Sequence, residues 1–64
     1  MKYQVTVKTS KSNNLFNTTV EADRIGQATT SAMIQFLKTT KLSGDLVLYK
    51  VVDESGNTVL NQFN

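Results

Sequence analysis

The chain has 64 residues, with seven basic and five acidic side chains and neither cysteine nor histidine. This length predicts one domain over residues 1–64, and the missing residue types exclude disulfides, cysteine nucleophiles, histidine bases and the usual zinc ligands. The formal charge of +2 comes from scattered lysines, which is a weak signal for nucleic-acid binding. We therefore expect no enzyme, no cofactor, no metal site and no small-molecule substrate.

The first third of the chain predicts two strands joined by a polar loop. Residues 2–8 alternate between apolar and polar side chains, which is typical of a strand with one wet face. Residues 10–14 are Ser, Lys, Ser, Asn and Asn, a composition that favours a hairpin loop. Residues 15–22 alternate again, and this alternation places Leu15 in the outer row.

A single amphipathic helix follows. Asp23 is expected to cap it, because a carboxylate can accept the free amide hydrogens of the first turn, so the helix is predicted to start at Arg24. It is expected to stop near Lys41, with Gly44 available as a left-handed residue beyond it. Ile34 falls on the polar side and is expected to be a single exposed apolar residue. The stripe expected to face the sheet comprises Ile25, Ala28, Ala32, Met33, Phe36 and Leu37.

The segment 46–52 is apolar on both of its alternating faces, and a hairpin connects it to a fourth strand at 58–63. The turn between them ends in Gly56, which is expected to be left-handed and to place Asp53 opposite Asn57. That register creates two rows of side chains. The row assigned to the helix-covered core comprises Val47, Tyr49, Val51, Val59 and Phe63. The row left on the open side contains Leu46, Leu48, Val52 and Leu60.

The predicted fold class is α+β, a ββαββ domain with one helix packed on one face of a four-stranded sheet. The order 2-1-3-4, all antiparallel, is favoured because the doubly apolar third strand then lies in the centre. The alternative order, 2-1-4-3, is the arrangement of the immunoglobulin-binding domains of streptococcal surface proteins, with which the sequence shares the order of elements and no residue motif. Which face the helix covers stays open at this point, but one apolar row is uncovered in either case.

The uncovered row predicts a protein-interaction surface. One helix can bury only one face of the sheet, so we expect Leu46, Leu48, Val52 and Leu60, with Leu15 beside them, to bind a second copy of the chain or a protein partner. The alternative is a nucleic-acid-binding accessory factor that uses the lysines of the same face. Because the aromatic side chains are assigned to the inner face, that alternative lacks stacking platforms. Its candidate phosphate contacts are Lys2, Lys8 and Lys50.

The setting of the protein is predicted from composition alone. No apolar run approaches the roughly 20 residues that span a bilayer, and residues 1–4 lead directly into alternation rather than a signal peptide. We therefore expect a cytoplasmic protein with no membrane partner. In its abundance of Thr, Asn and Ser, the chain resembles small accessory proteins of phages and mobile elements that act on a host protein.

Overall fold

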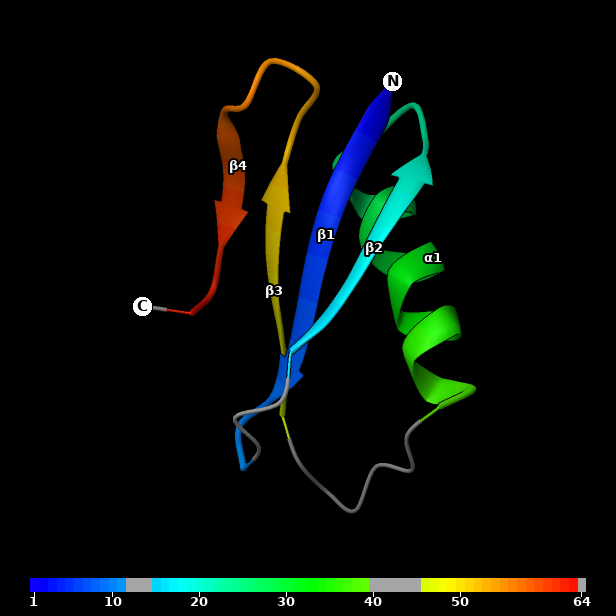
Figure 1. The fold of residues 1–64 in the computed structure, drawn as a ribbon, viewed down its shortest axis with the longest axis vertical. Coiled ribbons are helices and arrows are strands. Elements are labelled where there is room, and N and C mark those ends of the chain that lie inside the picture. Colours follow the sequence, from blue (N-terminus) through cyan, green and yellow to red (C-terminus); the bar gives the residue numbers. More distant parts are fainter. Residues whose placement is uncertain (12–14, 40–45, 64) are drawn as a thin grey trace.

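The computed structural model describes residues 1–11, 15–39 and 46–63, which form one helix and a four-stranded sheet (Figure 1). Each neighbouring pair of strands is antiparallel and the order is β2-β1-β3-β4, so the predicted α+β fold and strand order are confirmed. Lys41, Gly44 and most of the expected loop at 10–14 lie outside the described residues. The elements are β1 (Lys2–Thr9), β2 (Phe16–Glu21), α1 (Ile25–Leu37), β3 (Val47–Val52) and β4 (Thr58–Asn61).

The core lies between α1 and the middle of the sheet. Val5 and Val7 of β1 and Val51 of β3 are fully buried, and two buried alanines, Ala28 and Ala32, let the helix approach these strands closely. Phe36 completes the helix face and packs against Phe16, with ring centroids 5.8 Å apart and planes tilted by 56°. The predicted inward rows of β1 and β2 are therefore confirmed. The predicted helix stripe is confirmed at Ala28, Ala32 and Phe36 but was wrong at Leu37, which is 44% exposed. The buried side chains form a single core, which comprises Tyr3, Val5, Val7, Val20, Ala22, Ala28, Ala32, Phe36 and Val51.

The helix covers only part of its face of the sheet. It packs against β1 and β2 and less extensively against β3, and Figure 1 shows it on the β2 side with β4 at the far edge. Val47, Tyr49 and Leu60 on the β3–β4 side are consequently only partly buried against the core. Burial nevertheless raises the pKa of the Tyr49 hydroxyl above its ordinary value.

Both predicted ends of the helix were wrong. Arg24, not Asp23, occupies the N-cap position, in an extended conformation and with no side-chain cap bond. Gln27 reaches back instead, its Oε1 accepting the Asp23 N–H at 3.0 Å, so this bond holds the residue before the N-cap against the first turn. The helix ends at Leu37, and the hydroxyl of Thr39 donates to the Phe36 carbonyl at 2.9 Å, a local bond that competes with further helical turns.

The turn between β3 and β4 forms as predicted. Gly56 has a φ of 85°, the left-handed conformation that glycine adopts without strain. The Asp53 N–H donates to the Asn57 carbonyl at 2.9 Å, and the Gly56 N–H donates to the Asp53 carbonyl at 3.0 Å. The Asp53 carboxylate adds bonds from the N–H groups of Ser55 and Asn57.

The register beyond this turn differs from the prediction. Val52 pairs with Thr58, but Val51 pairs with Leu60, so a bulge places Val59 as an extra residue in β4. Because side chains alternate along a strand, one extra residue exchanges the two faces for everything after it. Leu60 was predicted on the open side and instead packs against the core, while Val59 is 38% exposed. Phe63, predicted to face inward, lies under Lys8 on the open side.

The Phe36–Phe16 contact supports a direct stability prediction. Replacing Phe36 by Ala should lower the free energy of unfolding by about 3 to 5 kcal/mol, because it removes the largest side chain of the helix face and leaves a cavity. Urea denaturation followed by circular dichroism measures this loss. Leu37→Ala is the matched control, since that neighbour is 44% exposed and should change little. Equal losses for the two variants would contradict the observed helix face.

The bulge supports a second prediction. Leu60→Ala should lower the free energy of unfolding by about 2 kcal/mol, because Leu60 packs against the core. Val59→Ala should change it by about 0.5 kcal/mol or less, since Val59 stands out of the ladder. Denaturant melts of both variants measure the difference. A larger loss of unfolding free energy at Val59 than at Leu60 would contradict the bulge and support a regular register.

Candidate protein-binding face

The open face is the side of the sheet opposite α1. Strand pairing identifies its residues, because partners across a ladder share a face and alternate residues along a strand point to opposite faces. It is mostly polar, with threonine, asparagine and lysine side chains, and its apolar members are concentrated at β3. From the ladders it comprises Lys2, Gln4, Thr6, Lys8, Asn17, Thr19, Glu21, Leu48, Lys50, Val52, Thr58 and Asn61.

Four of its side chains form a row across one end, here called the apolar row: Leu15, Lys8, Leu48 and Phe63. Lys8 pairs with Leu48, and the β1–β2 register continued by one residue sets Leu15 beside Lys8. On the other side, the Gln62 N–H donates to the Tyr49 carbonyl at 2.9 Å, so the next pair along β3 and β4 is Leu48 with Phe63. The Lys8 Nζ lies 4.8 Å from the centre of the Phe63 ring, a cation–π contact that draws the lysine stem across Leu48.

Two strongly exposed leucines lie at this end of the open face, Leu15 within the row and Leu46 next to it. Leu46 is 70% exposed and Leu15 is 55% exposed. Leu46 is held by Ser10, whose N–H donates to the Leu46 carbonyl at 2.9 Å and whose Oγ accepts the Leu46 N–H at 3.3 Å. Alternation along β3 then puts Leu46 on the same face as Leu48. Three of the leucines predicted from sequence to bind a partner therefore gather at one end of the open face.

The other two predicted residues lie elsewhere. Val52 is on the open face but pairs with Gln4, and Lys50 separates it from Leu48. Leu60 is on the helix side, as the bulge requires. Phe63 takes the place opposite Leu48 that the predicted register gave to Gln62. The sequence carried no signal for this change of face, because it does not show which residue of β4 is the extra one.

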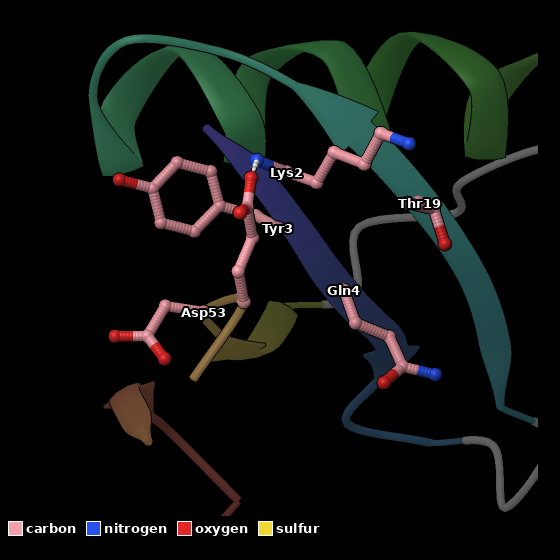
Figure 2. Close-up of a pocket in the computed structure, with 6 residues that line it drawn as sticks. Lys2, Tyr3, Gln4, Thr19 and Asp53 are labelled. Atoms are coloured by element: carbon pink, nitrogen blue, oxygen red, sulfur yellow. Dashed lines mark hydrogen bonds between the residues drawn. The ribbon is translucent and has the colours of Figure 1, made fainter. Parts of the chain in front are cut away.

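The opposite end of the sheet carries a shallow polar hollow of about 310 Å³ (Figure 2). Its rim is built where the β3–β4 turn folds against the start of β1, and the Glu54 carboxylate accepts the Lys2 N–H there. That carboxylate substitutes for the strand carbonyl that would otherwise continue the β1–β3 ladder. The hollow is lined by Lys2, Tyr3, Gln4, Thr19, Asp53 and Glu54.

The carboxylates of this hollow have structural partners. Asp53 accepts two backbone N–H bonds within its own turn, and Glu54 ties that turn to β1. Among the described residues, no three carboxylate, histidine or cysteine side chains gather closely enough to hold a metal ion. Within the same residues no helix has the length and apolar character needed to cross a membrane. The hollow thus shows anchoring contacts and no paired groups poised for proton transfer.

The lysines proposed as nucleic-acid contacts do share the open face, but they do not cluster. Lys2 lies by the hollow, Lys50 pairs with Thr6 in the middle, and Lys8 lies at the opposite end of β1. Phe63 is an aromatic ring on this face that the sequence interpretation did not expect. The Lys8 ammonium already lies over one side of this ring, which reduces the use of the ring as a stacking platform for a base.

Comparison of the chain with protein-family models, curated proteins and solved structures finds no match. The function is therefore argued from the open face itself. Its distinctive element is the apolar row with Leu46, since the rest of the face is polar and evenly spread.

The spread of the lysines predicts weak nucleic-acid binding. Few phosphates can be contacted at once, so the Kd for random single- or double-stranded oligonucleotides should be about 0.1 mM or weaker at physiological salt. Fluorescence anisotropy with labelled oligonucleotides at several salt concentrations measures it. A sequence-selective complex of submicromolar Kd at that salt would contradict this prediction and favour the nucleic-acid alternative.

Proposed function

We propose that this protein is a non-catalytic protein-binding module that uses the apolar row and Leu46 as its contact surface. The observation that carries the proposal is the position of two exposed leucines next to the Lys8–Leu48 pair. Leu15, 55% exposed, lies beside Lys8, and Leu46, 70% exposed, lies two residues from Leu48 along the chain. Single exposed apolar residues are common on protein surfaces, but a contiguous group of them is typical of an interaction site.

The surroundings of this surface fit the anatomy of a protein interface. The adjacent row across the sheet is polar and can supply hydrogen bonds at a rim. Within it, the Thr6 hydroxyl donates to Asn17 Oδ1 at 2.6 Å, which fixes both side chains before a partner arrives. An apolar centre beside ordered polar groups favours a protein surface over a phosphate backbone, which offers nothing to cover leucines.

Charge selects among protein partners. The open face carries Lys2, Lys8 and Lys50 against one carboxylate, Glu21. Two copies stacked face to face, about 10 Å apart, would bring these lysine-rich surfaces together. Like charges across an interface are costly, so a different protein with an acidic, apolar surface is the better occupant. Under the predicted phage or mobile-element setting, that partner is a host protein.

The proposal is tested by placing carboxylates on the contact surface. A double variant, Leu15→Glu with Leu46→Glu, should fold normally because both side chains are exposed, yet repel an acidic partner and leave buried charge at any contact. Affinity capture from the source organism, quantified by mass spectrometry, should recover a partner with the natural chain and at least tenfold less with the variant.

Leu37→Glu with Val59→Glu is the matched control. These two residues are 44% and 38% exposed and lie on α1 and at the bulge of β4, outside the apolar row, so the same change in charge should leave capture intact. Denaturant melts should show that both double variants keep the natural fold. A partner captured equally by all three chains would show that the apolar row has no binding role.

A further inference from the structure

The two edges of the sheet differ in how well they are protected. Unpaired edge strands tend to pair with other chains, and proteins usually block them with short strands, bulges, prolines or lysines. At one edge, β4 has four residues and carries the bulge at Val59. At the other edge, β2 has six residues, Phe16–Glu21, without a bulge, proline or lysine. β2 is therefore the edge open to pairing.

The alternation of hydrogen bonds along β2 shows which of its backbone groups are available to a further strand. The Ala22 N–H donates to the Met1 carbonyl at 2.9 Å, so alternate residues back along β2 also bond to β1. The residues between them, Asn17, Thr19 and Glu21, direct their N–H and C=O groups away from the sheet. No described residue bonds to those backbone groups. Each needs a partner or water.

We propose that a second copy of the chain pairs antiparallel along β2, about a two-fold axis at Thr19. The two sheets then join into one antiparallel sheet of eight strands, twice the four of one chain. In this register Thr19 lies opposite Thr19 of the second copy, and Asn17 lies opposite Glu21 of the second copy.

The side chains of β2 suit this pairing. Threonine opposite threonine is a favourable cross-strand pair, and no like charges face each other. Asn17 Oδ1 already accepts the Thr6 hydroxyl, which leaves the Asn17 amide hydrogens to donate to the carboxylate of Glu21 of the second copy. A second copy also presents a strand that is already ordered, whereas a disordered peptide would lose conformational freedom on binding.

The position of α1 determines where the two helices lie in such a dimer. The Thr18 hydroxyl donates to Gln35 Oε1 at 2.7 Å, so one flank of the helix follows β2 at the level of the proposed axis. A two-fold axis through the β2 edge therefore sets both helices on the same face of the joined sheet.

A dimer that pairs along the β2 edge leaves the open face uncovered. Pairing along β2 uses backbone groups at the rim of the sheet and does not cover the apolar row, so a dimer of this kind presents two apolar rows on one continuous surface. This inference is therefore separate from the protein-binding role proposed above, and either can fail without the other.

Proline at Thr19 tests the edge directly. The Thr19 N–H points outward, so Thr19→Pro removes a donor that β1 does not use and places a ring against the incoming strand. Sedimentation equilibrium should show a concentration-dependent dimer for the natural chain, twice the 7.1 kDa of one copy, and a monomer with unchanged circular dichroism for Thr19→Pro. Asn61→Pro is the control, because it places proline at an outward position of the β4 edge and should leave the dimer intact.

A cysteine variant tests the register and does not depend on the proline variant folding. The chain has no cysteine, so Thr19→Cys can form a disulfide only between copies. Paired residues of this type have Cα atoms about 5.5 Å apart, within disulfide range, so oxidation should give a cross-linked dimer. Gln4→Cys, exposed on the same face but one strand inward, should cross-link at least tenfold more slowly.

Three outcomes would overturn the inference. One is a natural chain that stays monomeric up to about 1 mM. Another is equal cross-linking at the two cysteine positions. The third is a dimer that survives Thr19→Pro but is lost in Leu15→Glu with Leu46→Glu, since that result would place the second copy on the open face and leave the protein-binding role standing.

Discussion

The packing of a single helix on part of a four-stranded sheet constrains the rest of this structure. The helix α1 has thirteen residues and approaches the sheet through Ala28 and Ala32, which brings it close to β1 and β2. Close contact concentrates the core beneath the helix, where Val5 and Val7 are fully buried. The β3–β4 half of the same face and the whole opposite face must then be stabilised without a covering layer.

The bulge at Val59 is the response to that constraint. β3 is apolar on both faces, and a regular β4 would have left Leu60 opposite Lys50, on the same uncovered side as Leu48. One extra residue moves Leu60 to the core and Phe63 to the open face, where the ring and the Lys8 stem shelter Leu48. The chain thus covers a central strand with its own lysine and aromatic side chains, and the strongly exposed leucines are Leu15 at one end of that row and Leu46 next to it.

Sequence periodicity was sufficient for the element order, the strand order, the inward rows of β1 and β2 and the centre of the helix stripe, because each of these follows from burial along a regular repeat. It assigned Leu37 to the stripe as well, and that residue is exposed. It was insufficient for β4, since a bulge shifts the register without changing composition and Thr58, Val59 and Leu60 allow either pairing. It also failed at Asp23. This typical capping residue does not occupy the N-cap position, and its own N–H donates to the Gln27 side chain. Of the candidate site, Leu15, Leu46 and Leu48 were predicted together, whereas Phe63 depended on the bulge.

Small size links assembly to stability in this protein. A chain of 64 residues buries too little surface for a wide stability margin, and the absence of cysteine and histidine removes disulfides and the usual zinc ligands as supports. Pairing along β2 would satisfy the outward backbone groups of that edge and leave the open face uncovered. The folded state would then gain stability with protein concentration, because association draws on the native form alone. A module stabilised in this way presents its contact surface in duplicate, so two weak contacts on one partner assembly can act together.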